Sequence, residues 1–175
     1  MGQFQFSKLD ARTRGLMAEE VLQATKEDNL YYSARFTEAA KAQWPDLLLG
    51  AARGHDEHWL EQQLHAIHAM KPRETKATPR GGVTQANVPD TAAETYADGQ
   101  FNRFYIAAIC RRAIDDRVGS VRVYRAKERS DPRPSSKLLE GTQKDAGVLL
   151  TEVRDRDRSL QCDLLKPNSG LTIDY

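Results

Sequence analysis

The sequence has few cysteines and no long hydrophobic run, and each shortage excludes a class of protein. Its two cysteines, Cys110 and Cys162, cannot form the disulfide framework of a small secreted domain. The first residues, MGQFQFSKLD, lack the apolar stretch of a secretory signal peptide, and no segment reaches the ~20 apolar residues that span a membrane. We therefore expect a soluble protein that is made in a reducing compartment and does not contact a membrane.

Neither sign of charge prevails in the chain. Lysine and arginine total 26 against 25 aspartates and glutamates, which gives a net charge of +1. A dedicated nucleic-acid binder usually has a basic excess on one face, so the balance argues against that class but allows a local basic patch. Hydrophobic residues make up 39% and charged residues 29% of the chain, so much of it must be surface. Either the core is small or other chains supply part of it.

Residues 1–70 are predicted to form a small helical module. Apolar residues recur at helical spacing between residues 11 and 26, and again between residues 57 and 70. Gly54 is expected to end the helix that precedes this second stripe. A residue that favours a helix start stands at the beginning of each predicted helix: Asp10, Thr37, Pro45 and Asp56.

Residues 71–89 have a different composition. The run KPRETKATPRGGVTQANVP contains three prolines, a glycine pair and almost no apolar side chains. It cannot form a helix and has too little to bury, so we predict an extended linker or arm, with Arg80 available to a partner. The run divides the chain into a helical module (1–70), a linker (71–89) and a second module (90–175).

The most apolar part of the sequence lies in a helix predicted to start at Asp90, its N-cap, and to continue through FNRFYIAAICRRAI. Gly99 is a candidate break in this helix, and Gly119 is expected to end it. A helix that is apolar almost all round usually forms the centre of its module.

A short β element is predicted to follow the central helix. Residues 120–126 are rich in β-branched side chains, and Val121 and Val123 would face inward. Asp145 is expected to start a last helix. The predicted fold class is therefore α+β and mainly helical, with the central apolar helix packed on the short β element.

Three segments resemble arms that reach other chains. Phe4 and Phe6 alternate with polar residues, as in an extended segment that docks on a neighbour. Residues 71–89 supply a second arm. The C-terminal tail, with Leu171 and Ile173, is strand-like and could pair with the edge of a neighbouring sheet. We expect contact with other chains to hold these segments.

All four histidines lie within fourteen residues, at His55, His58, His65 and His68. On a single helix they span too wide an arc for all of them to bind one zinc or nickel ion, which needs three or four converging ligands. We interpret them as a polar helix flank, and a metal site is the less favoured alternative.

The sequence has no recognisable catalytic group. Cys110 lies among apolar residues of the predicted central helix, where burial keeps a thiol protonated and inert. No serine stands in a Gly-x-Ser-x-Gly elbow, and Gly81–Gly82 lacks the strand–turn–helix context of a phosphate loop. We therefore predict no enzymatic activity, no metal and no cofactor.

A group of arginines surrounds the end of the central helix. Guanidinium groups bind phosphates and carboxylates alike, so with Tyr105 and Tyr124 the group could form a nucleic-acid surface. Acidic neighbours make ion pairs within the chain or between subunits an equally good interpretation. The arginines are Arg103, Arg111, Arg112, Arg117, Arg122 and Arg125, and the acidic neighbours are Asp98, Asp115 and Asp116.

Four short strings, FNRFYIAAICRRAI, VYRAK, DPRPSS and PNSGL, resemble a family of proteins encoded by tailed bacteriophages and prophages. The resemblance covers mainly the C-terminal half of the chain. It implies a phage or prophage origin and a virion-associated role, with synthesis in the bacterial host cytoplasm. No site is assigned in the family, so no functional residue is carried over.

Together these features predict a non-enzymatic structural subunit of a phage-like particle, of the capsid-decoration, collar or head–tail connector type. Its partners would be capsid, neck or tail proteins, and further copies of itself are a second option. The alternative is a nucleic-acid-binding or regulatory accessory protein that uses the arginine group. The residues predicted to contact partners are Phe4, Phe6, Arg80, Arg103, Tyr105, Arg112, Arg125, Leu171 and Ile173.

Overall fold

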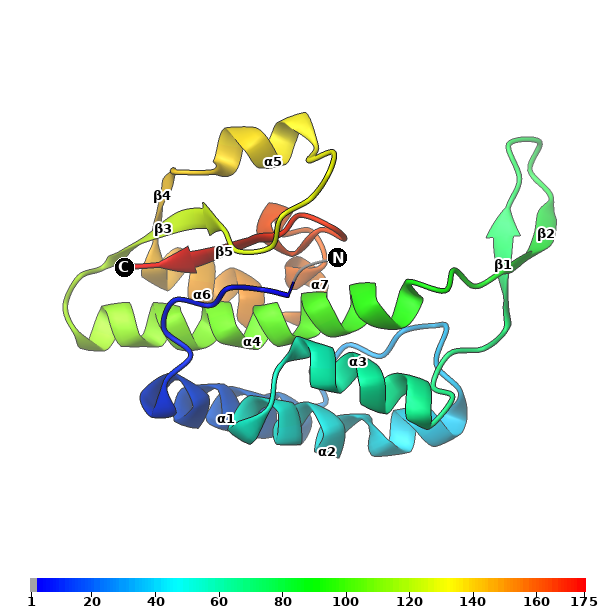
Figure 1. Ribbon diagram of the computed structural model, residues 1–175, viewed down its shortest axis with the longest axis horizontal. Coiled ribbons are helices and arrows are strands. Elements are labelled where there is room, and N and C mark those ends of the chain that lie inside the picture. Colours follow the sequence, from blue (N-terminus) through cyan, green and yellow to red (C-terminus); the bar gives the residue numbers. More distant parts are fainter. Residues whose placement is uncertain (1–2) are drawn as a thin grey trace.

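The computed structural model describes residues 3–175 and is built around one long helix (Figure 1). Helix α4 (Ala92–Asp115) runs through the middle of the molecule, and its residues 100–110 are all buried. Three helices pack along one side of it, and a small sheet and α6 lie on the opposite side (Figure 1). The predicted α+β, mainly helical fold is confirmed. The three helices are α1 (Ala11–Lys26), α2 (Glu38–Gly54) and α3 (Glu57–Ala66).

Four predicted helix starts are confirmed by side-chain caps. Each capping oxygen accepts a hydrogen bond from the backbone N–H three residues further on, which satisfies one of the unpaired donors of the first turn. A cap of this kind stabilises a helix by about 1 kcal/mol. The capping residues are Asp10, Thr37, Asp56 and Asp145.

Pro45 does not start a new helix. It lies inside α2, which continues without a break to Gly54. A proline inside a helix removes one backbone hydrogen bond. Here the neighbouring side chains of Trp44 and Leu48 are fully buried, and their packing offsets that loss.

The start of α4 also differs from the prediction. The helix begins at Ala92, whereas Asp90 is exposed and lies before its N-cap residue Thr91. Thr91 makes no side-chain cap, and the backbone N–H of the buried residue Ala92 donates to the Pro89 carbonyl at 2.9 Å. Gly99 does not interrupt the helix.

A three-stranded antiparallel sheet lies against α4. Strand β3 (Ser120–Arg125) is its middle strand, between β4 (Gln143–Asp145) and β5 (Leu171–Asp174). The register places Val123 opposite Ile173, and both are fully buried. The predicted strand with Val121 and Val123 facing inward is confirmed. The connecting elements are α5 (Pro134–Leu139), α6 (Ala146–Arg154), α7 (Arg156–Ser159) and the 3-10 helix η1 (Asp163–Leu165).

Residues 71–89 form a β-hairpin rather than a linker. Strands β1 (Arg73–Ala77) and β2 (Val83–Asn87) pair antiparallel over their full lengths and project from the body (Figure 1). Gly81 in the turn has a φ of 80°, which glycine adopts without strain. The extended conformation was predicted correctly, but the pairing was missed because neither strand alternates apolar and polar residues.

The two expected modules share one hydrophobic core. Its buried residues come from α1–α3 as well as from α4, the sheet and α6. The reason is that α4 is apolar on nearly all sides: one side packs on the N-terminal helices and the other on the sheet and α6. A division into modules of residues 1–70 and 90–175 therefore does not describe the packing. No helix among residues 3–175 combines the length and apolar character needed to cross a membrane.

Candidate functional site

The N-terminal segment, expected to be an arm, is folded onto the chain's own core. The ring of Phe6 lies 4.4 Å from that of Tyr105 and 5.4 Å from that of Phe101, between ring centroids. Phe4 stacks on Phe6 at 5.0 Å and is buried, and its backbone N–H donates to the buried carboxylate of Glu57 at 2.8 Å. The prediction of an arm that reaches away from the body through Phe4 and Phe6 was wrong, because Phe6 packs on aromatic side chains of α4 and Phe4 stacks on Phe6.

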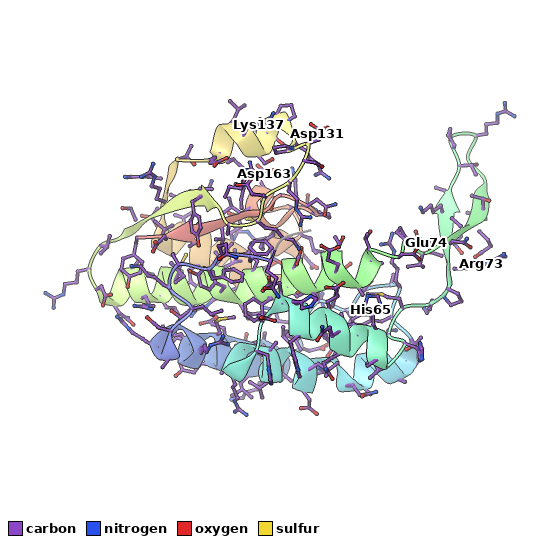
Figure 2. All side chains as sticks on the ribbon, in the orientation of Figure 1. His65, Arg73, Glu74, Asp131, Lys137 and Asp163 are labelled. Carbon is purple, nitrogen blue, oxygen red and sulfur yellow. The ribbon has the colours of Figure 1, made fainter. Side chains whose placement is uncertain are left out.

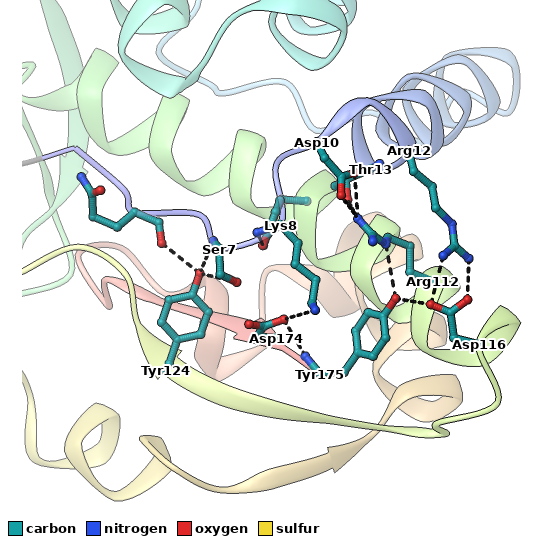
Figure 3. A network of polar contacts seen from close by, with 12 residues as sticks. Ser7, Lys8, Asp10, Arg12, Thr13, Arg112, Asp116, Tyr124, Asp174 and Tyr175 are labelled. Atoms are coloured by element: carbon teal, nitrogen blue, oxygen red, sulfur yellow. Dashed lines mark hydrogen bonds and ion pairs between the residues drawn. The ribbon is translucent and has the colours of Figure 1, made fainter.

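Hydrogen bonds hold this segment along its length (Figure 3). The hydroxyl of Tyr124 accepts from the Ser7 N–H at 3.0 Å and donates to the Gln5 carbonyl at 2.9 Å. The hydroxyl of Tyr105 accepts from the Lys8 N–H at 3.2 Å. Tyr105 itself is fully buried and therefore cannot serve as the predicted partner contact.

The C-terminal tail is likewise part of the body. Leu171 and Ile173 are fully buried in β5, and the Asn102 side chain donates to the Leu171 carbonyl at 2.8 Å. The hydroxyl of Tyr175 donates to Asp116 at 2.5 Å, beside the end of α4 (Figure 3). The tail is strand-like, as predicted, but it pairs with β3, the middle strand of the chain's own sheet, rather than with the edge of a neighbouring sheet. Leu171 and Ile173 are thus core residues.

Arg103 serves the fold and is not on the surface. Its side chain is 1% exposed and donates to the carbonyls of Val153 and Arg154 at 2.8 Å each. These carbonyls end α6, where backbone acceptors lack helical partners. Burial lowers the pKa of Arg103 to about 10, so the guanidinium still carries its charge near neutral pH.

The other arginines of the group are largely engaged within the chain. Arg112 donates to Asp10 at 2.7 Å, and Arg125 donates to Glu140 at 3.1 Å and to the Ser169 carbonyl at 2.9 Å. Arg111 likewise contacts two glutamates of α1, whereas Arg117 and Arg122 are exposed. Ion pairs within the chain, one of the two interpretations that the sequence left open, thus engage Arg111, Arg112 and Arg125.

The four histidines do not converge. His55 stacks on Trp59 at 4.1 Å between ring centroids, and His58 and His65 both contact Glu61, at 3.2 and 3.7 Å. No group of three or more His, Cys, Asp or Glu side chains among residues 3–175 is placed to hold a metal ion.

Both thiols lie in the interior. Cys110 and Cys162 are buried, and burial raises the pKa of Cys110 to about 12 and that of Cys162 to about 11. Each thiol is therefore protonated near neutral pH and out of reach of a substrate.

A cavity of about 360 Å³ lies at the base of the hairpin, between α4 and the C-terminal segment. Tyr31, Arg35, Tyr96 and Gln100 contribute to its walls. Among the described residues that line it, none is a histidine or a cysteine, and the ionic groups Arg35 and Glu74 neutralise each other. The lining thus offers hydrogen-bonding groups without a nucleophile–base pair.

The hairpin is anchored at its base and otherwise exposed. Arg35 donates to both carboxylate oxygens of Glu74, at 2.7 and 3.0 Å, which fixes the start of β1 on the body. Beyond this point most side chains are exposed, including Arg80 in the turn and Val83, which is 75% exposed. Figure 2 shows Arg73 and Glu74 beside the anchored end and His65 at the adjoining end of α3. Of the predicted contact residues, Arg80 is the one in this projecting part.

The pairing of residues 71–89 into a hairpin was not predicted from the sequence. Its two strand sequences, RETKA and VTQAN, are separated by TPRGG, which contains the proline and glycines typical of a turn. The β-branched residues Thr75, Val83 and Thr84 were the available strand signal. These features could have predicted a hairpin even though the segment has almost nothing to bury.

The sequence matches no protein-family model, and neither a curated protein nor a solved structure matches the chain. The geometry of the described residues and the resemblance stated above are therefore the grounds for a functional proposal.

Proposed function

We propose that the chain is a non-enzymatic structural subunit of a phage-like particle, of the capsid-decoration, collar or connector type, and that its hairpin contacts a neighbouring subunit. One observation carries the proposal: a regular two-stranded ribbon projects from a compact body and buries almost none of its own side chains. A lone hairpin is only marginally stable in water, so a ribbon of this kind gains from a partner.

The rest of the molecule supports a contact role for this element. The N-terminal segment, the C-terminal tail and most of the arginine group are engaged by their own chain, as described above. Of the segments predicted to reach other chains, residues 71–89 alone project from the body. The assignment to a phage particle comes from the resemblance of the FNRFY, VYRAK, DPRPSS and PNSGL strings.

The direct test is mass spectrometry of particles purified by density gradient from the bacterium that carries the gene. We expect the chain among the virion proteins at a fixed ratio to the major capsid protein. Its presence in the host cytoplasm together with its absence from particles would contradict the proposal.

A nucleic-acid contact through the hairpin is the second candidate. Between Lys71 and Pro89 four basic residues stand against the single acidic residue Glu74, and a two-stranded ribbon fits a DNA major groove. Filter binding of DNA and RNA at increasing salt tests it. Retention that falls steeply with salt, and that is lost in an Arg73→Gln, Lys76→Gln, Arg80→Gln variant, would favour this candidate.

A further inference from the structure

We infer that the outer edge of β2 is a docking site for β2 of a second copy of this chain, so that two hairpins form one four-stranded antiparallel sheet. The inference deepens the proposed function and rests on its premise that the hairpin is the contact element. It names the occupant of that contact and the strand that receives it.

Along its outer edge, β2 has a row of backbone N–H and C=O groups that do not pair with β1. Thr78 donates to the Gly82 carbonyl at 2.8 Å and Val88 donates to the Pro72 carbonyl at 3.0 Å, at the two ends of the ladder. Hydrogen-bonded and non-hydrogen-bonded positions alternate in an antiparallel pair. The N–H and C=O groups of Val83, Gln85 and Asn87 therefore point away from β1, toward open solvent.

Strand β2 lacks the features that normally prevent an exposed edge strand from pairing with another chain. Exposed edge strands usually carry charges, proline or a bulge, which prevent pairing with another chain. The strand V-T-Q-A-N has no charge and no proline, and it pairs with β1 in an unbroken register. The apolar side chain of Val83 is 75% exposed on it.

The other edge of the hairpin is protected. Strand β1 carries Arg73, Glu74 and Lys76 within five residues. Glu74 is held by Arg35 of the body, which ties this strand to its own chain. In Figure 1, β2 is the strand on the side away from the body, so a second chain can approach it without meeting the helices.

The outer edge of β2 is complementary to the same edge of a second copy. A two-fold axis through Gln85 places Val83 opposite Asn87 of the second copy and Thr84 opposite its Ala86, with Gln85 facing Gln85. The three residues with outward backbone groups then fall at hydrogen-bonded positions, each donating and accepting once. No charge meets a like charge, which is the arrangement that an isologous contact requires.

The contact is small, and this fits a subunit that acts in an assembly. Two five-residue strands bury less than the ~1,000 Å² of a stable free interface, so the isolated dimer is weak. Within a particle, other contacts raise the effective concentration of the two edges, and the same pairing then holds.

Cysteine trapping in the full-length protein tests the inference. Both native cysteines are buried and do not interfere. Gln85→Cys places a thiol on the proposed axis, and Thr75→Cys is the matched control at the paired position on β1. Under mild oxidation we expect Gln85→Cys to form disulfide dimers about tenfold faster than Thr75→Cys, because pairing holds its thiols together. Equal rates, or no dimer from Gln85→Cys, would overturn the inference.

A second measurement removes a backbone N–H group from each edge of the hairpin by substitution with proline and introduces no thiol. Gln85→Pro removes an N–H that points outward and leaves the β1–β2 ladder intact, and Thr75→Pro does the same on β1. Sedimentation velocity over a range of concentrations should detect dimers of the wild type and Thr75→Pro but not of Gln85→Pro. Dimers of Gln85→Pro at the wild-type level would contradict the inference.

The structural role of the chain and the pairing of the β2 edges can be contradicted separately. Incorporation into particles that needs the hairpin, without dimers of Gln85→Cys, would overturn the second copy as the occupant and leave the structural role in place. Dimers of Gln85→Cys from a protein that is absent from particles would support the edge pairing and contradict the structural role.

Discussion

Arg112, in the last turn of α4, donates to the carboxylate of Asp10 at 2.7 Å, and the same carboxylate accepts from the Thr13 N–H at 3.0 Å. Asp10 therefore caps α1 and ties it to the far end of the central helix at the same time. Beside it, Arg12 donates to both carboxylate oxygens of Asp116, at 2.9 and 3.0 Å (Figure 3). These contacts close the N-terminal segment onto the body.

This network predicts a loss of stability in acid. The hydrogen bond from the Thr13 N–H, and next the Arg112 side chain, lower the pKa of Asp10. The Arg12 side chain, and next the Tyr175 hydroxyl, lower the pKa of Asp116 to about 2 from its ordinary value of 3.8. Because both values are lower in the folded state, the stabilisation is complete above about pH 4 and is lost as the pH falls through the folded-state values.

The measurement is the free energy of unfolding in urea between pH 5 and pH 2, in about half-unit steps. Asp116→Asn should flatten the acid limb of this profile. Asp46→Asn, at an exposed carboxylate on α2, is the control and should leave the profile unchanged. Superimposable profiles for the wild type and Asp116→Asn would contradict the role of the network.

Packing of Phe6 on the core means that its removal should destabilise the fold, whereas removal of a side chain in a free arm would not. Phe6→Ala should lower the free energy of unfolding by about 2 kcal/mol, less than a fully buried phenylalanine because the ring is half-buried. The exposed neighbour Gln5 is the control, and Gln5→Ala should change the free energy of unfolding by under about 0.5 kcal/mol. Thermal or urea unfolding measures both. Equal stability of the two variants would mean that Phe6 is not part of the core.

A substitution at Ile173 tests in the same way whether the C-terminal tail belongs to the core. Ile173→Ala should cost about 2–5 kcal/mol of stability, because the side chain is fully buried between β3 and α4. Val148→Ala, at a side chain that is 66% exposed, should cost far less. A tail that served a neighbouring chain would give an Ile173→Ala monomer as stable as the wild type.

Gly99 predicts a gain in stability. It lies inside α4, and an added Cβ would meet no atom within 4 Å. Gly99→Ala should therefore raise the free energy of unfolding by about 0.5–1 kcal/mol through helix propensity alone. A decrease in stability on urea unfolding would contradict the open space beside Gly99.

Local rules predicted the helices well. Asp10, Thr37, Asp56 and Asp145 cap helices through contacts three residues away, and such contacts can be anticipated from spacing alone. The central helix was predicted from its length and its high apolar content, because a helix that contacts the core on nearly every side has little apolar periodicity. Pro45 was misjudged since the burial of its neighbours depends on tertiary packing.

The candidate site was less predictable for a physical reason. An alternating segment such as Phe4–Phe6 can cover a neighbour or its own chain, and the choice depends on the position of Tyr105, about a hundred residues away in sequence. The burial of Arg103 was equally unpredictable, because its guanidinium donates to carbonyls at the end of α6, which is distant in the sequence. The hairpin was missed because its strands have no apolar face to bury.

The central claim is that the hairpin is the element through which this chain holds its neighbours. The most direct measurement replaces residues 75–85 with Asn-Gly, which keeps the Arg35–Glu74 anchor and closes a short turn on the hydrogen-bonded pair Glu74–Ala86. Quantitative mass spectrometry of purified particles then compares incorporation with the wild type. We predict unchanged thermal stability and incorporation reduced about tenfold or more, since the avidity of the hairpin contact is lost. Full incorporation of the shortened protein would contradict the account.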